Sequence, residues 1–220
     1  MLKFVHQAIR DIRTTGSFFP SSPVLARAMT NSLRAHRGAK RILEVGPGTG
    51  PFTAQILRAL RGHDALDIVE LNPIFCEHLE VRLLRKFRAH HPAIPVRLHS
   101  QAIEHAPLEG EYDFVICGLP FNNFPLALTQ SIFHRLFELM RDGAEMTYFE
   151  YAGVRRMKAP FVGSSGRDRI RRFEAFKSST AKSHKVTREL VVANLPPAHA
   201  VRIIKRKGGF EQCFESTKTF

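Results

Sequence analysis

The sequence predicts an α/β fold in which a mostly parallel sheet is covered by helices on both faces. Short apolar segments alternate with segments whose apolar residues have helical spacing, and the links between them are short. A glycine-rich stretch follows the first apolar segment directly, at the strand end where open parallel sheets bind their ligands. The 220 residues, 44% of them hydrophobic, are enough for one globular domain with a full core.

The first forty residues are expected to form two helices ahead of the sheet. Residues 1–15 place apolar side chains at helical spacing, with basic side chains on the other side of the helix, which predicts an amphipathic helix. The stretch Gly16–Pro23 ends that helix, and Ser22-Pro23 is a typical start for a second one. We therefore expect residues 1–40 to form an amphipathic helix and a lid-like helical segment.

Residues 41–220 are expected to form the main domain. Its last two apolar segments are joined by a tight connection containing Leu-Pro-Pro, which predicts an antiparallel strand at the C-terminal end. A basic insert is expected at about residues 153–182. Strands are expected at 41–45, 65–71, 95–100, 112–120, 144–151, 184–194 and 198–207, and helices at 52–60, 73–90 and 126–140.

The stretch Glu44–Gly50 reads Glu-Val-Gly-Pro-Gly-Thr-Gly and predicts a ligand close to the backbone. A second acid, Glu70, ends the next strand, where a carboxylate can accept both hydroxyls of a ribose. The spacing differs from the dinucleotide fingerprint, because Pro51 replaces the third glycine. An acid at Glu44 would repel a pyrophosphate, whereas it suits the ammonium group of a methionine moiety.

This arrangement resembles motif I of the S-adenosylmethionine (SAM)-dependent methyltransferases. The resemblance implies a Rossmann-like class I methyltransferase fold with a seven-stranded sheet and SAM as the cofactor. It also implies that the loop at Gln101 meets the adenine, with an amide where the superfamily often has an acid. The cofactor contacts that it implies are Glu44, Gly46, Pro47, Gly48, Thr49, Gly50, Glu70, Leu71, Gln101, Ala102 and Gly118.

The acceptor is expected at Cys117–Pro125, where the fourth strand ends. Ribosomal RNA adenine dimethylases carry Asn-Leu-Pro-Phe or Asn-Leu-Pro-Tyr there, and their asparagine binds the target amino group. In this chain Gly118 takes that position and has no side chain to do so. Because of this difference, methylation of RNA adenine at N6 is kept only as the alternative function. Nucleic acid is a partner only in that alternative.

The chain is more similar to the bacterial phospholipid N-methyltransferases, which methylate phosphatidylethanolamine stepwise towards phosphatidylcholine. Three further segments carry this resemblance besides Glu44–Gly50: Pro20–Met29, Gly118–Pro120 and Asn194–Ala198. The resemblance implies a phospholipid substrate, with Leu119 and Pro120 beside the acceptor. The polar stretch that contains Asn122 and Asn123 departs from the family, and these residues could bind the headgroup or cap a helix.

Transfer of a methyl group to an amine needs a neutral amine and a site that tolerates a quaternary ammonium product. Tyr148 and Tyr151 lie at the end of the fifth strand, and aromatic faces attract such cations. Tyr148 could orient the amine and Tyr151 could cradle it, with Glu150 or a water as proton acceptor. Both tyrosines could equally fill the core.

The net charge of +13 predicts an anionic partner. Residues 155–188 hold eleven Lys and Arg and only two acids, with apolar side chains along one helical side. We expect this stretch and residues 1–15 to contact an anionic membrane surface. A solvated surface or RNA binding are the alternatives for the same charge, and no protein partner is predicted.

Three cysteines, an odd and sparse count, suit a reducing compartment. No apolar run is long enough to span a membrane, and the N-terminus lacks the pattern of a signal peptide. The eleven histidines are scattered, so no metal site is predicted. These features favour a cytoplasmic protein, peripheral on the inner face of the cell membrane.

Overall fold

The computed structural model describes residues 21–121, 124–152 and 164–209, with the backbone alone for residues 164–170. Several sequence predictions lie outside these residues and stay predictions. They are the amphipathic helix at residues 1–15, the roles of Asn122 and Asn123, and most of the basic stretch before residue 171.

The described residues form a seven-stranded sheet in the order β3-β2-β1-β4-β5-β7-β6. All strand pairs from β3 to β5 are parallel, whereas β7 runs antiparallel to both β5 and β6. The predicted mostly parallel sheet with an antiparallel C-terminal strand is confirmed. The strands are β1 (Arg41–Val45), β2 (Ala65–Glu70), β3 (Val96–Ser100), β4 (Tyr112–Cys117), β5 (Met140–Tyr151), β6 (Lys185–Val191) and β7 (Ala198–Ile204).

Strand β1 lies between β2 and β4 and is buried on both faces. Such a position requires a continuous apolar segment rather than an alternating one, which explains the sequence Ile42-Leu43 before Glu44. Strand β5 begins at Met140, four residues earlier than the predicted Ala144. Its register against β4 shifts near Tyr112, and Gly143 has a positive φ of 80°. The first residues of β5 are therefore irregular and do not show the alternating pattern that predicts a strand.

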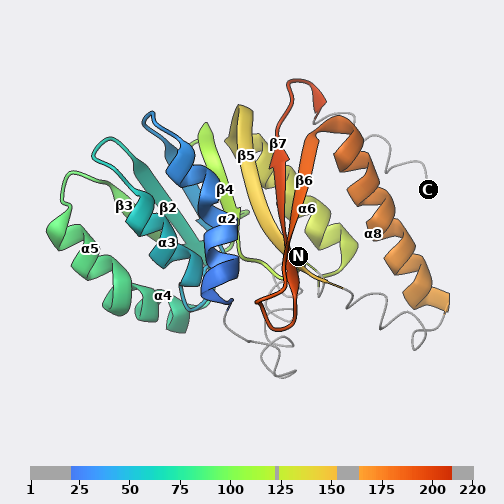
Figure 1. The fold of residues 1–220 in the computed structure, drawn as a ribbon, viewed down its shortest axis with the longest axis horizontal. Coiled ribbons are helices and arrows are strands. Elements are labelled where there is room, and N and C mark those ends of the chain that lie inside the picture. The colour runs from blue at the N-terminus through green and yellow to red at the C-terminus, as the bar shows by residue number, and fades with distance from the viewer. Residues whose placement is uncertain (1–20, 122–123, 153–163, 210–220) are drawn as a thin grey trace.

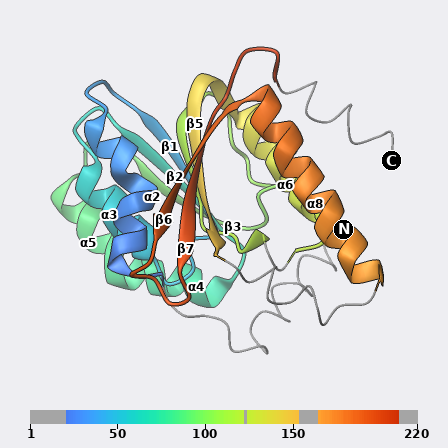
Figure 2. The same cartoon turned by 45° about the vertical axis from the view of Figure 1, so that its right-hand side comes forward.

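Helices cover both faces of the sheet (Figures 1 and 2). The predicted single helix at 73–90 is one continuous helical run with a π-helical turn, η1, between α4 and α5. The helical segments are α2 (Pro23–Ala35), α3 (Pro51–Ala59), α4 (Pro73–Leu79), η1 (Glu80–Leu84), α5 (Arg85–His90), α6 (Leu126–Leu139) and α8 (Ser164–Ser183).

Two apolar cores lie on opposite faces of the sheet. One joins α2, α3 and α4 to residues such as Ile42, Ile68 and Phe149. The other joins α6 and α8 to residues such as Leu43 and Met146. The burial of α2 in the first core places its N-terminal end beside the sheet, and its predicted role as part of a lid stays a prediction.

Helix α8 corrects one sequence expectation. The apolar side of the basic stretch was expected to be exposed to a membrane, yet Phe173 and Phe176 are buried. Phe176 packs edge-to-face on Phe133 of α6, with 5.3 Å between ring centroids. Phe173 and Phe176 face α6 because α8 covers that face of the sheet, so they stabilise the core and are not available to lipid.

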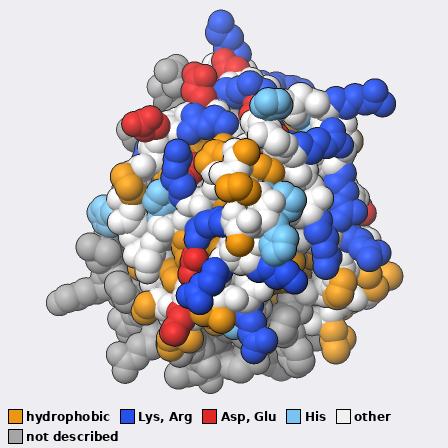
Figure 3. Space-filling model, turned by 90° about the vertical axis from the view of Figure 1, so that its left-hand side faces the viewer, with side chains coloured by type: hydrophobic (Ala, Val, Ile, Leu, Met, Phe, Trp, Pro, Cys, Tyr) orange, Lys and Arg blue, Asp and Glu red, His pale blue; other side chains and the backbone are white. Residues whose placement is uncertain are grey.

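Both edge strands carry exposed basic side chains. Arg97 lies on β3, and Lys185 and Arg188 lie on β6. Lys and Arg side chains are spread over the face that contains β3 and α5 (Figure 3). Charged side chains on an edge strand disfavour pairing with another sheet, so part of the net charge protects the sheet edges.

Candidate functional site

The cavity that combines most of the predicted cofactor residues lies at the edge where β1, β2 and β4 end. Its volume of about 700 Å³ includes open solvent at its mouth. Four loops meet there because β3, β2, β1 and β4 are neighbours in the sheet and run parallel. The predicted residues that line the cavity are Gly46, Gly48, Glu70, Leu71, Gln101, Ala102, Gly118, Leu119 and Pro120.

The glycine-rich loop exposes its backbone to this cavity at Gly48. Gly48 has a φ of 58°, and a Cβ there would meet no atom within 4 Å. The backbone is therefore open to a ligand at a position where a side chain would also be strained. Pro47, Thr49 and Gly50 do not line the cavity; the Pro47 carbonyl accepts a hydrogen bond of 3.0 Å from the Gly50 N–H, which closes the turn.

Glu70 connects the glycine-rich loop to the end of β2. Its Oε2 accepts a hydrogen bond of 3.1 Å from the Gly48 N–H, and its Oε1 accepts one of 2.8 Å from the Asn72 N–H. Burial raises the pKa of Glu70, and these two hydrogen bonds oppose the shift. Each carboxylate oxygen can accept a further hydrogen bond, so Glu70 fits the ribose role that the resemblance implies.

Glu44 lies behind the cavity rather than in its wall. Its side chain is fully buried, Oε1 accepts a hydrogen bond of 3.0 Å from the Thr53 hydroxyl, and Oε2 is buried without a partner. Burial raises the pKa of Glu44 to about 8. With this pKa the side chain is protonated at neutral pH when no cation is near it, and an ammonium group beside Oε2 would favour the ionised form, so this oxygen and the open backbone at Gly48 fit the methionine end of SAM.

Several cavity residues were missed by the sequence reading. Phe75 lies in the first turn of α4, Ile103 and Glu104 follow β3, Phe124 precedes α6, and Ile132 lies within α6. Most are apolar, and apolar side chains in a helix give no sequence signal that separates a cavity wall from the core. Phe75 is the one that could have been found, because it stands five residues after Glu70, just beyond the end of β2.

Gly118 brings the end of β4 into close contact with the glycine-rich loop. A Cβ on Gly118 would lie 2.4 Å from the Gly46 carbonyl oxygen, so no other residue fits without a backbone shift. The Gly118 N–H donates a hydrogen bond of 2.8 Å to the Val45 carbonyl oxygen. The absence of a side chain at Gly118 is therefore imposed by packing between the two loops.

The two predicted tyrosines do not lie together. Tyr148 packs in the core shared with α6 and α8, whereas Tyr151 packs against the opposite core through Phe149, with 5.3 Å between ring centroids. Residues three apart on a strand point to opposite faces. Neither residue lines the cavity at the strand ends, and the roles of Tyr148 in orienting the amine and of Tyr151 in cradling it stay predictions.

Tyr148 belongs instead to a buried polar network at the end of β5. Its hydroxyl donates a hydrogen bond of 3.1 Å to Glu150 Oε1, and Lys177 Nζ of α8 donates one of 2.9 Å to Glu150 Oε2. Both carboxylate oxygens of Glu150 therefore have partners. The role of Glu150 as proton acceptor stays a prediction.

The described part of the segment Pro20–Met29, which starts at Ser21, meets the segment Asn194–Ala198. The Ser22 N–H donates a hydrogen bond of 2.9 Å to Asn194 Oδ1, and Asn194 Nδ2 donates one of 2.7 Å to the Pro196 carbonyl oxygen. Ser22 also caps α2, because its Oγ accepts a hydrogen bond of 3.1 Å from the Leu25 N–H. The buried Asn194 thus connects two segments that carried the resemblance to phospholipid N-methyltransferases separately.

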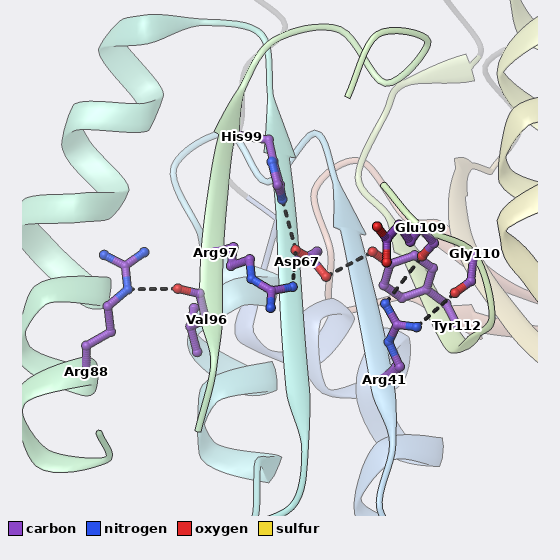
Figure 4. A network of polar contacts seen from close by, with 9 residues as sticks. All are labelled: Arg41, Asp67, Arg88, Val96, Arg97, His99, Glu109, Gly110 and Tyr112. Carbon is purple, nitrogen blue, oxygen red and sulfur yellow. Dashed lines mark hydrogen bonds and ion pairs between the residues drawn. The ribbon is translucent and has the colours of Figure 1, made fainter. Parts of the chain in front are cut away.

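A second polar cluster lies on the sheet face over β2, away from the cavity (Figure 4). Asp67 accepts hydrogen bonds of 2.9 Å from the Tyr112 hydroxyl and 2.9 Å from His99 Nε2. Burial and the neighbouring Asp67 raise the pKa of Tyr112, which keeps its hydroxyl protonated as a donor. The described segment 101–111 forms no helix. The side chains of Tyr112 and His99 supply the hydrogen bonds that the buried Asp67 carboxylate requires.

Within the described residues, no group of three or more His, Cys, Asp and Glu side chains has an arrangement that could hold a metal ion. The expected lack of a metal stays a prediction. No helix in the described part of the chain combines the length and apolar character that crossing a bilayer requires.

Comparison with known proteins gives one curated relative with a lipid substrate in its name. The chain is 30% identical over 117 residues to the ornithine lipid N-methyltransferase of Singulisphaera acidiphila. The match covers 53% of this chain and 60% of that relative, so the chain spans less than two thirds of its length. No model of a known protein family matches the chain.

Solved structures of methyltransferases share the fold. The O-methyltransferase TomG of Streptomyces achromogenes, in complex with SAM, has a TM-score of 0.60 at 18% identity, over 91% of this chain and 88% of TomG. An O-methyltransferase of Bacillus cereus, in complex with SAH, has a TM-score of 0.62 at 14% identity, over 92% and 91% of the two chains. This chain therefore has the Rossmann-like fold of the class I methyltransferases.

Proposed function

We propose that this protein transfers methyl groups from SAM to the amine of a membrane lipid, with phosphatidylethanolamine as the acceptor. The observation that carries the proposal is the single cavity that combines the glycine-rich loop, Glu70 and Gly118–Pro120 at the strand ends. The similarity to an ornithine lipid N-methyltransferase supports a lipid amine as acceptor. The motifs shared with phospholipid N-methyltransferases support phosphatidylethanolamine in particular.

The residues of the cavity have separate tasks in this proposal. SAM supplies an electrophilic methyl group on a sulfonium. Glu70 would hold the ribose hydroxyls, and Glu44 would pair with the ammonium group through its unpartnered Oε2. The apolar wall, which includes Phe75 and Ile103, would exclude water from the adenine. Fixing the donor against the acceptor amine is the main contribution that the chain can make to an in-line displacement.

The packing at Gly118 disfavours the alternative in which RNA adenine is the acceptor. Adenine dimethylases use an asparagine at this position, and here the Gly46 carbonyl oxygen occupies the space of its Cβ. A lipid amine does not require that side chain, provided that the backbone at Leu119 and Pro120 borders the acceptor.

A cytoplasmic location on the inner face of the cell membrane is part of the same proposal. It is supported by the net charge of +13, which favours an anionic leaflet, and by the free, buried thiols of Cys76 and Cys117. Fractionation of cells that express the tagged full chain would test it, and recovery of the protein only outside the cytoplasmic membrane fraction and cytoplasm would contradict it.

The reaction is tested with radiolabelled SAM and vesicles that contain phosphatidylethanolamine. We expect label in mono-, di- or trimethylated ethanolamine lipid after the products are separated. Parallel reactions contain vesicles with ornithine lipid or ribosomal RNA in place of phosphatidylethanolamine. Label only in ornithine lipid would retain the lipid amine and reject phosphatidylethanolamine, whereas label only in RNA would reject the proposed function.

A further inference from the structure

Four exposed apolar side chains belong to two segments, the first turn of α2 and the β6–β7 turn, that are joined by a hydrogen bond between Ser22 and Asn194. We call Val24, Leu190, Val192 and Leu195 the apolar rim; their exposed fractions are 47%, 53%, 72% and 72%. Val24 lies in the first turn of α2, and the other three belong to the end of β6 and the turn before β7.

The direction of β6 places this turn on the same edge of the sheet as the cavity, with β5 and β7 between β6 and β4. Strand β7 runs antiparallel to β5, and β6 runs antiparallel to β7, so β6 is parallel to β1, β4 and β5. Its C-terminal end therefore lies at the edge where the glycine-rich loop and Gly118 lie. Figure 1 shows the β6–β7 turn and the first turn of α2 together at this lower edge.

The turn holds its apolar side chains outward in a fixed backbone. Asn194, between Val192 and Leu195, is buried and bonds both the Ser22 N–H and the Pro196 carbonyl oxygen. The same bond fixes the first turn of α2, which contains Val24. Exposed apolar groups on a rigid support are costly in water, and such a patch is typical of a surface that binds a partner or a membrane.

The charge around the apolar rim favours an anionic lipid surface as the partner. The described segments 21–43 and 190–209 contain no Asp or Glu, and the nearest acid on β6, Glu189, is paired with Arg202 at 2.8 Å. Arg27 of α2 and Arg188 of β6 are exposed beside it. Apolar side chains that are flanked by Arg, with the one neighbouring carboxylate of β6 already paired, are a combination that favours the interface of an anionic bilayer.

We propose that the apolar rim inserts into the lipid interface and brings the cavity mouth against the bilayer. This inference rests on the proposed function, because it gives a reason for a lipid-binding surface at this edge. The partner is the bilayer itself, and the rim adds a contact to those predicted for residues 1–15 and for the basic stretch 155–188. It would let a lipid headgroup reach Leu119 and Pro120 without leaving the membrane.

The test compares the wild-type full chain with the double variant Val192→Ser/Leu195→Ser. Flotation is measured with vesicles of phosphatidylethanolamine and phosphatidylglycerol. We expect the variant to bind about tenfold more weakly or worse, since two apolar side chains lose their burial in lipid. Val81→Ser is the matched control, because Val81 is also exposed, at 55%, but lies on η1 and not at this edge.

Methyl-transfer assays distinguish a defect in membrane binding from a defect in the reaction itself. With vesicles, the double variant should lose activity by the same factor as binding. With a short-chain phosphatidylethanolamine below its micelle concentration, its rate and its SAM affinity should equal those of the wild type. Equal vesicle binding by variant and wild type would overturn the proposal, as would loss of a wild-type dimer in the variant without loss of vesicle binding. Failure of the wild type to methylate any lipid would instead reject the proposed function, since flotation is measured separately.

Discussion

At the residue scale, the site depends on positions where a side chain is absent as much as on those where one is present. Gly118 and Gly46 approach each other across β1 and β4, and Glu70 holds the Gly48 N–H from β2. Glu44 is fully buried with one unpartnered oxygen. The contact between Gly118 and Gly46 and the hydrogen bond from Gly48 to Glu70 fix the shape of the loops. The unpartnered oxygen of Glu44 favours a positively charged group near these loops.

Substitution Gly118→Ala is expected to destabilise the protein by roughly 1–3 kcal/mol, a cost typical of overpacking. The added methyl group would meet a backbone carbonyl, which cannot move aside as a flexible side chain can. Thermal unfolding measures the loss, and SAM affinity should fall with it. Gly62→Ala is the control, because a Cβ on Gly62 meets no atom within 4 Å. Equal unfolding temperatures for both variants would contradict the close contact.

Glu44 makes the stability depend on pH in a definite direction. Its pKa is raised to about 8, so between about pH 4.5 and pH 8 the folded protein holds a proton that the unfolded chain has lost. The free energy of unfolding therefore falls as pH rises through this range, by up to about 1.4 kcal/mol per pH unit. His184 acts oppositely but only from about pH 4 to pH 6.5, since burial lowers its pKa to about 4.

We therefore expect Glu44→Gln to flatten the decline in stability between about pH 6.5 and pH 8, where His184 no longer contributes. Glutamine keeps an acceptor for the Thr53 hydroxyl but has no proton to lose. Denaturant unfolding at several pH values measures the slope. The exposed Glu109→Gln is the control and should leave the wild-type slope unchanged; an unchanged slope in Glu44→Gln would show that Glu44 is ionised at neutral pH.

At the element scale, the contact between α2 and the β6–β7 turn organises the edge around the cavity. Ser22 and Asn194 are 172 residues apart in the chain. Their hydrogen bond joins two of the segments that carry the resemblance to phospholipid N-methyltransferases, Pro20–Met29 and Asn194–Ala198. Arg202 of β7 adds a second link, because its NH2 donates a hydrogen bond of 2.6 Å to the Ala28 carbonyl oxygen. Helix α2 is thus attached to the C-terminal hairpin at two points.

Asn194→Ala should destabilise the protein by about 1–3 kcal/mol, because it leaves the Ser22 N–H and the Pro196 carbonyl oxygen without their partner. We also expect methyl transfer to vesicles to fall by a larger factor than SAM affinity, since the turn is not part of the cavity. Thermal unfolding and calorimetry measure the two effects. Ala193→Ser, at the exposed neighbour, should stay within about 0.5 kcal/mol of wild type; an equal effect of both variants would argue against the link.

At the scale of the whole molecule, cofactor binding and surface binding lie at one edge but use different elements. The cavity is built from the loops after β1 to β4, whereas the apolar rim belongs to α2 and the β6–β7 turn. The sheet keeps these groups in fixed positions relative to each other. Each function can therefore be removed without the other.

Glu70→Ala is expected to weaken SAM binding by about tenfold to a hundredfold, as loss of hydrogen bonds to a charged group typically does. Flotation with vesicles should be unchanged, because Glu70 is buried at the cavity and not at the rim. Calorimetry with SAM measures the first effect. The control is Glu77→Ala, an exposed acid on α4. Parallel loss of both activities would mean that Glu70 only maintains the fold.

Local patterns in the sequence determined most of the fold and the base of the site. Buried parallel strands leave continuous apolar segments, and glycines after the first one mark the end of β1. The spacing from Glu44 to Glu70 covers one strand–helix–strand unit, so chain connectivity alone predicts that both acids lie near the same loop. Gln101, Ala102 and Gly118–Pro120, which the resemblance to known methyltransferases implied, also lie in the cavity wall, and each follows a parallel strand.

Only the tertiary structure decided which distant residues meet. The opposite faces of Tyr148 and Tyr151, the burial of Phe173 and Phe176, the contact of Gly118 with Gly46 and the link from Ser22 to Asn194 depend on strand order and on how α8 packs. Periodicity reports which side chains are apolar but not which layer covers them, so a core aromatic and a membrane-facing aromatic look the same along the chain. Contacts between residues far apart in sequence are set by the arrangement of the whole sheet, which no local segment encodes.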